Sequence, residues 1–516
     1  MRIEARLHES VKRFAEKTAA VAGGVRLSYA ELDAVSDGLA TALCNAGVAP
    51  GDRVVLLLDN DIEAPISFFA TWKAGAVACP LYPSIKAEKL SGILSSVDPA
   101  AIIAHARHLP TLCAAIAAAG VKTVVIAAQA PIGSDLAMLH FENLAGTEVS
   151  GPLPGFEDDN ALALLIHTSG STGTPKGVML THANVDAACQ SIVDYLENTA
   201  DEVVLSVLPL SFGYGITQMV TMAYVGGTLV LEKSFAFPRK ILERLAEEKA
   251  TGFPLVPAMA ALISGMKDLP TDLLPYLRYI TSAAAALPPA LSSRLQHLLP
   301  QSKIFVMYGQ TECLRVSYLP PEDLAARPTS VGLAIPGTRA FVVDERGEAA
   351  APGVIGELVV EGPHVMAGYW ENEASTQHTS GATEVGRRLH TGDLFRMDED
   401  GFLYFVSRRD DIIKTRGEKV SPQEVERVLY ALPGIREAAV TGVDDPVFGQ
   451  VVRAHVALEA GCDLTDRDII RHCATNLEDY MVPKSVEFRA TLPRTTTGKI
   501  RMSTGADVEP QLENVL

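Results

Sequence analysis

Long hydrophobic runs are missing from this sequence, and its N-terminus carries charges of both signs from the second residue. A membrane-spanning helix needs about 20 predominantly apolar residues in succession, and a signal peptide needs an apolar segment behind a basic one. We therefore expect no membrane span and no signal peptide. The protein is predicted to be soluble and cytoplasmic.

Cysteine is also scarce, with seven residues scattered along the chain and no CxxC pair among them. Their odd number cannot all pair within one chain. Structural disulfides are typical of oxidising compartments, and cysteine-bound metal sites need closely spaced ligands. We expect buried thiols in a reducing compartment and no metal cluster.

Positive charge is in deficit, since 44 Lys and Arg residues face 62 Asp and Glu residues, for a formal net charge of -18. Nucleic acids and anionic membranes attract basic surfaces. The composition therefore argues against either as the main partner. Any phosphate group must be held by a local arrangement of donors.

The length of 516 residues exceeds what one hydrophobic core usually organises, so we expect at least two domains. Apolar residues make up 48% of the chain and charged residues 21%, which argues against extensive disorder. Between residues 22 and 167, strand-like apolar segments alternate with helix-like segments. This alternation predicts an α/β fold with covered, substantially parallel sheets.

The pattern changes at residues 340–406, where short apolar runs are bounded by Gly, Pro and Asp. Such runs predict antiparallel strands, here as a small β-barrel-like part of the large domain. A fresh alternation of helix-like and strand-like segments follows and predicts a small α+β domain. We place the boundary between a large domain of residues 1–407 and a small domain of residues 408–516.

Residues 161–182 join a hydrophobic strand pattern to a loop that is rich in small and hydroxyl-bearing residues. The residues expected to bind phosphate are Thr168, Ser169, Gly170, Ser171, Thr172, Gly173, Thr174 and Lys176. Glycines let backbone N–H groups approach a ligand, hydroxyls donate, and lysine adds positive charge, so this loop can wrap a polyphosphate. It is not a Walker A loop, because no GxxxxGK[ST] spacing fits it. A flexible Ser/Gly linker is the alternative, which the flanking apolar segments disfavour.

The string HTSGSTGTPKGVMLTH at residues 167–182 resembles the signature of the adenylate-forming (AMP-binding) superfamily. That superfamily includes acyl- and aryl-CoA synthetases, amino-acid adenylation domains and firefly luciferase. The resemblance runs from about residue 25 to about residue 502. It implies that the large domain binds the nucleotide and the acid, and that the small domain is mobile and carries the catalytic lysine.

A second motif, YGQTE at residues 308–312, follows a predicted strand. The resemblance implies that Tyr308 lies by the adenine, that Thr311 contacts phosphate, and that Glu312 helps to hold Mg²⁺. The chemistry fits, because a carboxylate can attack the α-phosphate only if the charge there is neutralised. By itself this motif could equally be a hairpin turn.

A third motif, HTGDLFR at residues 390–396, contains Asp393. The resemblance implies that Asp393 and Arg408 bind the ribose hydroxyls, which a carboxylate accepts well. An ordinary turn aspartate is the alternative. Ser407 stands where the family usually has glycine, so the backbone there is expected to be less free.

Three further positions match the family's pattern in the small domain. The resemblance implies that Asp410 is the hinge, that Gly417 lies where the thiol arm passes, and that Lys499 is catalytic in the first half-reaction. A lysine in a Thr-rich loop would otherwise be read as a solvated surface residue. A lysine that reaches the site when the domains close would stabilise the approach of the two anions, the substrate carboxylate and the α-phosphate.

The acid pocket is expected around LPLSFGYG and TSAAAALPP, with Phe212, Gly213, Ala283, Ala284 and Ala285 as lining residues. Amino-acid-activating relatives place Asp at the position of Gly213, so an unpaired ammonium group would be costly to bury here. A fatty or aryl acid is therefore expected. The alanines could equally serve helix packing.

These observations predict an AMP-forming acyl-CoA synthetase with ATP as substrate, Mg²⁺, and CoA as the thiol, acting in fatty acid metabolism. The alternative acceptor is the phosphopantetheine thiol of an acyl carrier protein. Minor alternatives are a stand-alone amino-acid adenylation enzyme, a non-catalytic nucleotide-binding relative and a luciferase-like oxygenase.

Overall fold

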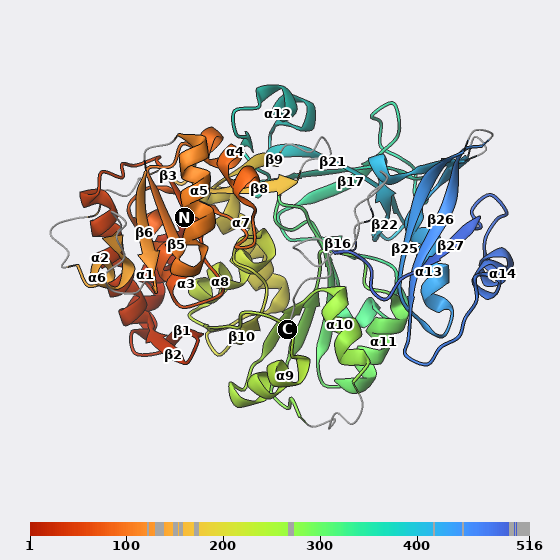
Figure 1. The fold of residues 1–516 in the computed structure, drawn as a ribbon, viewed down its shortest axis with the longest axis horizontal. Coiled ribbons are helices and arrows are strands. Elements are labelled where there is room, and N and C mark those ends of the chain that lie inside the picture. Colours follow the sequence, from red (N-terminus) through yellow and green to blue (C-terminus); the bar gives the residue numbers. More distant parts are fainter. Residues whose placement is uncertain are drawn as a thin grey trace. The chain divides into compact units, whose positions relative to one another are not determined.

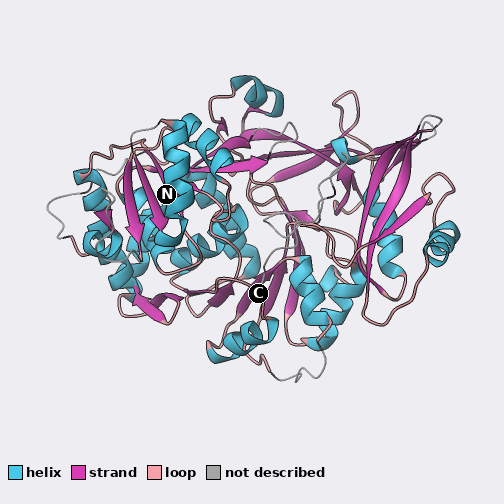
Figure 2. Ribbon diagram, viewed as in Figure 1, coloured by secondary structure: helices cyan, strands magenta, loops and turns pink. Residues whose placement is uncertain are grey.

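The computed structural model describes residues 1–120, 123–129, 139–147, 153, 158–169, 175–266, 273–415, 418–445, 448–494, 500 and 502. These residues fall into two units, and Figure 1 and Figure 2 show their elements. The first unit comprises Met1–Leu287, Arg294–Phe341 and Val359–Thr391, and the second comprises Pro288–Ser293, Val342–Leu358 and the chain from Gly392 onward. The domain boundary at residues 407/408 stays a prediction.

An eight-stranded sheet lies in the first unit. In spatial order its strands are β19 (Gly368–Tyr369), β9 (Pro175–Thr181), β8 (Leu162–Ser169), β4 (Val77–Pro80), β3 (Arg53–Leu57), β5 (Ala101–His105), β6 (Val124–Ala128) and β7 (Leu139–His140). Neighbours from β8 to β7 run parallel. The pairs β8–β9 and β9–β19 are antiparallel.

A nine-stranded sheet lies in the same unit. Its order is β16 (Leu333–Ala334), β15 (Ser317–Leu319), β14 (Lys303–Tyr308), β13 (Tyr279–Ser282), β12 (Gly252–Leu255), β10 (Val203–Ser206), β11 (Thr228–Leu231), β1 (Thr18–Ala22) and β2 (Val25–Ser28). Neighbours from β14 to β1 run parallel. Both sheets confirm the predicted α/β class.

Helices connect these strands, and side-chain caps begin several of them. The first unit contains α1 (Ile3–Phe14), α2 (Tyr29–Asn45), α3 (Glu63–Lys73), α4 (Ala87–Val97), α5 (Leu109–Ala119), α6 (Phe141–Ala145), α7 (His182–Leu196), α8 (Gly213–Val225), α9 (Pro238–Glu247), α10 (Pro257–Ser264) and α12 (Glu373–Thr379). Helix α11 (Pro289–Leu298) has residues in both units. Thr181 and Asn184 form a capping box that starts α7 directly behind the predicted phosphate motif.

Helices cover both faces of the eight-stranded sheet. Helices α4 and α5 pack on one face, where their leucines join Val55 and Leu57 in one buried cluster. Neighbouring residues of a strand point to opposite faces, so the equally buried Val54 and Leu56 belong to the other face. Helix α3 is tied to the sheet by Trp72, whose Nε1 donates to a carbonyl oxygen of β8 at 2.8 Å. Coverage of both faces is what a parallel sheet requires.

A five-stranded sheet forms from the region predicted to be β-barrel-like. Its strands are β17 (Arg339–Val343), β18 (Gly356–Gly362), β21 (Gly386–Met397), β20 (Ser380–Thr383) and β22 (Leu403–Arg408). The pairs β20–β21 and β21–β22 are antiparallel, as expected. Within the described residues this sheet stays open: β17 ends one edge and pairs only with β18, so no barrel closes.

The second unit also holds an α+β fold after residue 411. Its sheet contains β24 (Glu418–Val420), β23 (Ile413–Thr415), β26 (Gly449–Leu458), β25 (Ile435–Asp445) and β27 (Ser485–Phe488), with helices α13 (Pro422–Ala431) and α14 (Asp466–Asn476). Val425, Leu429, Ile469 and Cys473 on the two helices are fully buried against this sheet. A separate core of this kind agrees with the predicted α+β unit.

The cysteines are all free thiols. Cys79, Cys189, Cys313 and Cys473 are buried, whereas Cys44, Cys113 and Cys462 are only half-buried. The expectation of buried thiols therefore holds for four of the seven. Along the described ranges, no helix combines the length and the apolar character that crossing a bilayer would require.

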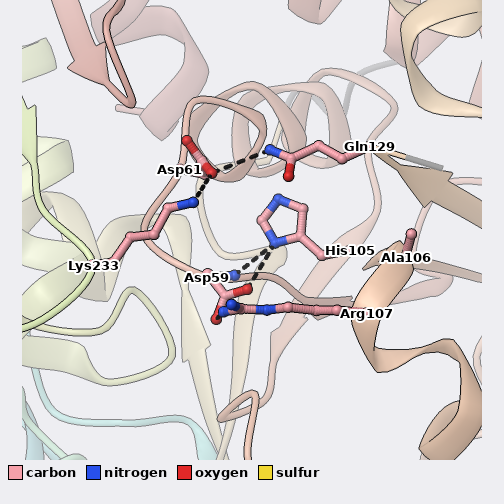
Figure 3. A pocket seen from close by; sticks show the side chains of 7 residues that line it. All are labelled: Asp59, Asp61, His105, Ala106, Arg107, Gln129 and Lys233. Carbon is pink, nitrogen blue, oxygen red and sulfur yellow. Dashed lines mark hydrogen bonds and ion pairs between the residues drawn. The ribbon is translucent and has the colours of Figure 1, made fainter. Parts of the chain in front are cut away.

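Polar side chains meet at the carboxyl ends of β3, β5 and β6 (Figure 3). They line a cavity of about 120 Å³, whose residues are Asp59, Asp61, His105, Ala106, Arg107, Gln129 and Lys233. None of these was predicted from the sequence as a site residue. Lys233 Nζ lies 2.6 Å from Oδ2 of Asp61, and Gln129 Nε2 donates to the same oxygen at 3.1 Å.

His105 lies between two carboxylates in this cluster. Its Nδ1 is 3.1 Å from Oδ2 of Asp59, and its Nε2 is 3.4 Å from Oε2 of Glu63. Burial lowers the pKa of His105, but the contacts with Asp59 and Glu63 outweigh burial and raise the pKa to about 9. The two carboxylates therefore favour the imidazolium form of His105 near neutral pH.

We expect this unit to lose stability as the pH rises toward 9. The unfolded histidine titrates near pH 6.5 and the folded one near 9, so the stabilisation is complete below about 6.5 and disappears as the pH passes 9, up to about 3 kcal/mol. The measurement is the unfolding temperature from about pH 6 to about pH 10 for the wild type and His105→Gln. The variant should remove this part of the pH dependence. The exposed His8→Gln is the control, and an equal change in both variants would contradict the assignment.

Candidate active site

The predicted phosphate loop connects the antiparallel strands β8 and β9. Thr168 lies opposite Lys176, and Ser169 lies opposite Pro175. The Thr168 hydroxyl donates to the carbonyl oxygen of Lys176 at 3.5 Å. The residues Gly170, Ser171, Thr172, Gly173 and Thr174 lie outside the described residues, so their contacts stay predictions. The connection joins strand to strand, whereas a Walker A loop leads into a helix.

Lys176 and Glu312 meet through Tyr369. Lys176 Nζ lies 5.1 Å from the centroid of the Tyr369 ring, within cation–π range. The Tyr369 hydroxyl donates to Oε1 of Glu312 at 2.9 Å. Burial and the neighbouring Glu312 carboxylate raise the pKa of Tyr369, so its hydroxyl keeps the proton that it donates. Two predicted residues from distant segments are thus brought together.

Tyr369 itself was missed in the sequence. It stands in a GYW string, where no charge pattern or motif marks it. Its position follows from sheet pairing, because β19 lies beside β9 with Tyr369 opposite Val178. Tyr369 could have been identified only by knowing that β19 pairs with β9.

The YGQTE segment connects β14 to the antiparallel β15, so the turn that the sequence left open is present. Gln310 Nε2 donates to the Tyr308 hydroxyl at 3.1 Å and to the carbonyl oxygen of Thr391 at 2.9 Å. The carbonyl oxygen of Glu312 accepts from the N–H of Met366 at 2.8 Å. Thr311 is half-buried. These bonds anchor the turn and fix the side chains that it carries.

Asp393 and Arg408 lie opposite each other in the second unit, on β21 and β22. Asp393 is 4% exposed, and Arg408 Nε lies 3.7 Å from its Oδ1. The preceding Gly392 has φ of 70° and donates its N–H to Oε1 of Glu357 at 3.1 Å. The positive φ at Gly392 favours glycine at this point of β21, and Asp393 is a buried strand residue, not an ordinary exposed turn aspartate.

Ser407 keeps an extended conformation in β22, is buried, and donates its hydroxyl to the carbonyl oxygen of Arg408 at 3.0 Å. A glycine is therefore not required there. Asp410 lies in the single turn Arg409–Asp411. Gly417 and Lys499 lie outside the described residues, so the roles of hinge, thiol passage and catalytic lysine stay predictions.

The segments expected to line the acid pocket follow the carboxyl ends of parallel strands. Phe212 and Gly213 follow β10, Ala283 follows β13, and Tyr308 ends β14. Strand β10 lies between β11 and β12, so the chain order switches direction there. Open α/β sheets bind ligands outside such a switch point. The sheet topology therefore supports the predicted location of the pocket.

Gly213 and Ala284 show how closely this region is packed. A Cβ atom at Gly213 would lie 2.6 Å from Cδ2 of Leu314, so a side chain there would displace that leucine. Ala284 has φ of 75°, a left-handed conformation that suits the glycine of the family pattern better. Phe212 stacks on Tyr82 with ring centroids 5.6 Å apart. Ala283 is buried and Ala285 is exposed, and their place in the acid pocket stays a prediction.

Comparisons with known proteins agree with this geometry. Residues 7–370 match the family described as AMP-binding enzyme, and residues 424–499 match the AMP-binding enzyme C-terminal domain. A feruloyl-CoA synthase of Amycolatopsis sp is 35% identical over 489 residues, 94% of each chain. A long-chain-fatty-acid–CoA ligase of Bacillus subtilis (strain 168) is 30% identical and aligns over 96% of this chain and 92% of its own. The crystal structure of ATP-bound MatB from Rhodopseudomonas palustris gives a TM-score of 0.88 at 29% identity, covering 97% of both chains.

The first family match contains Lys176, Glu312 and Tyr369, and the second ends at Lys499. The motifs, the contact between distant motif residues and the similarity along nearly the whole chain thus lead to one conclusion. The resemblance seen in the sequence is confirmed, and this chain is an enzyme of the AMP-binding family.

Proposed function

We propose that the enzyme activates a fatty or aryl carboxylic acid with ATP and transfers the acyl group to CoA. The contact of Lys176 with Tyr369 and of Tyr369 with Glu312 carries this proposal. The similarity to a feruloyl-CoA synthase and to a long-chain-fatty-acid–CoA ligase supports both acid classes.

In the first half-reaction, a carboxylate oxygen attacks the α-phosphorus of ATP. The bond from that phosphorus to pyrophosphate breaks, and acyl-AMP forms. Both reactants are anions, so the site must supply positive charge and N–H donors. Lys176 and the phosphate loop supply them from the large domain, with Thr311 beside the phosphates, and Lys499 supplies a second cation between carboxylate and phosphate.

Glu312 fits a magnesium ligand. Its carboxylate is half-buried, and none of the described cationic side chains forms an ion pair with it. Tyr369 orients one oxygen, as outer partners of metal ligands commonly do. When bound, Mg²⁺ would neutralise phosphate charge.

The nucleotide would be held by Tyr308 beside the adenine and by Asp393 with Arg408 at the ribose. In the second half-reaction, the CoA thiol loses its proton and attacks the acyl carbonyl, and AMP leaves. Rotation of the small domain about Asp410 would move Lys499 away from the site and bring the thiol passage beside Gly417 to it. An α-amino acid is disfavoured, because Gly213 supplies no carboxylate for the ammonium group and a side chain at this position would meet Leu314.

The direct test is pyrophosphate release over a panel of fatty, aryl and amino acids, with CoA, with a phosphopantetheinylated carrier protein, or with neither. We expect release with fatty or aryl acids and a thioester with CoA. A thioester formed only on the carrier protein would show that the carrier, and not CoA, is the acceptor.

Lys499→Ala should lower acid-dependent exchange of pyrophosphate into ATP at least about 100-fold, because it removes a positive charge that stabilises the transition state. The exposed Lys484→Ala is the control. Unchanged exchange in Lys499→Ala would show that this lysine takes no part in the mechanism.

Replacing Gly417 by leucine should separate the two half-reactions. A side chain in the thiol passage would block thioester formation while acyl-AMP still forms, because adenylation uses the other domain orientation. Pyrophosphate exchange and acyl-CoA formation are measured on the same preparation. Equal loss of both would contradict the assignment of Gly417 to the passage.

Tyr369→Phe should weaken the use of Mg²⁺. The variant keeps the ring under Lys176 but loses the hydrogen bond to Glu312, and loss of such outer partners typically costs about 10- to 100-fold in metal affinity or activity. The Mg²⁺ dependence of pyrophosphate exchange is the measurement. The exposed Tyr276→Phe is the control, and an unaltered Mg²⁺ dependence in Tyr369→Phe would refute the role.

A further inference from the structure

Arg315 is a buried cation without a counter-ion in the part of the chain that the structure describes. It lies between β14 and β15, and only 2% of the residue is exposed. No described carboxylate forms an ion pair with its guanidinium, and its Nε has no hydrogen-bond partner. Charged side chains are rarely this buried without a partner.

Two tyrosines face the guanidinium but do not balance its charge. The Arg315 Cζ lies 5.2 Å from the centroid of the Tyr214 ring, and the Tyr195 hydroxyl also faces the group. Burial raises the pKa of Tyr214 above its usual range. Burial, partly offset by Arg315, raises the pKa of Tyr195 to about 12. Both phenols stay neutral, so the positive charge is left uncompensated.

The guanidinium lies beside the segments assigned to the acid. Tyr214 directly follows Gly213, and its hydroxyl is 2.8 Å from the hydroxyl of Thr281 at the end of β13. The residue before Arg315 is Leu314, whose side chain fills the space next to Gly213. Arg315 thus lies beside Tyr214, whose hydroxyl contacts Thr281 of β13, and both tyrosine and threonine belong to the segments assigned to the acid.

The backbone is strained where it delivers this side chain. Leu314 has φ of 58°, a left-handed conformation that residues with a branched side chain rarely adopt. Strain of this kind persists only when surrounding contacts impose it, and it concentrates at ligand sites. A residue needed only to fill space could be apolar and would avoid the cost of a buried, unpaired charge.

We propose that the acid carries a second carboxylate, remote from the one that is activated, and that the Arg315 guanidinium binds it. The planar guanidinium matches a carboxylate with two parallel hydrogen bonds. Binding would supply the missing counter-ion and would fix the acid by its far end. This assignment rests on the proposed adenylation and specifies the class of acid as a dicarboxylic acid.

The test compares acids in which a terminal methyl group is replaced by a carboxylate: butanoate with succinate, hexanoate with adipate, and 4-methylbenzoate with terephthalate. The wild type should show a higher kcat/KM for pyrophosphate release with a diacid than with its monoacid. Arg315→Met, of similar length, should lower that value at least about 30-fold for the diacid and change the monoacid value by less than about threefold. Arg315→Lys should recover part of the loss and serves if the methionine variant does not fold. Arg239→Met removes an exposed arginine and is the control.

Preference for monoacids in the wild type, or an equal effect of Arg315→Met on both members of a pair, would overturn the role of Arg315 and leave adenylation intact. Absence of pyrophosphate release with every acid would overturn the proposed adenylation and this inference with it. A diacid preference that disappears only in the Arg315 variants would support the inference.

Discussion

The hydrogen bond from Tyr369 to Glu312 joins the two large sheets of the first unit. Tyr369 belongs to β19 at the edge of the eight-stranded sheet, and Glu312 follows β14 of the nine-stranded sheet. Lys176, on the strand next to β19, contacts the same ring. The proposed nucleotide chemistry therefore depends on the packing of two sheets, because neither sheet alone carries both the lysine and the carboxylate.

The candidate sites lie where parallel strands end. In the nine-stranded sheet, the residues assigned to the acid and to the nucleotide follow the carboxyl ends of β10, β13 and β14. The same rule applies to the eight-stranded sheet, where Asp59 follows β3 by two residues and His105 ends β5, next to the change in strand order. There the charged groups pair with one another, whereas Arg315 has no counter-ion among the described residues. The two sheets thus differ in whether the charged groups near their carboxyl edges are paired.

Lys176, Glu312 and Asp393 could be proposed as site residues from the sequence, because each stands in a local string whose residue types suit phosphate, metal or ribose. The α/β class was equally predictable, since hydrophobic periodicity is a local property. Tyr369 and Arg315 could not be found in this way, because their roles depend on partners from other strands. Barrel-like closure at residues 340–406 was predicted from strand content alone, and the described strands instead form an open sheet, because closure depends on which edges pair.

The β8–β9 hairpin has a consequence for how this scaffold could be re-engineered. Its stems are fixed in register by seven paired positions, from Leu162 with Thr181 to Ser169 with Pro175. Residues 163–166 of β8 and residues 177, 178, 180 and 181 of β9 are buried, and burial of the strands specifies their register. The predicted phosphate-binding loop is therefore the natural place to graft a loop of different length or sequence, because the paired strands on either side set the register.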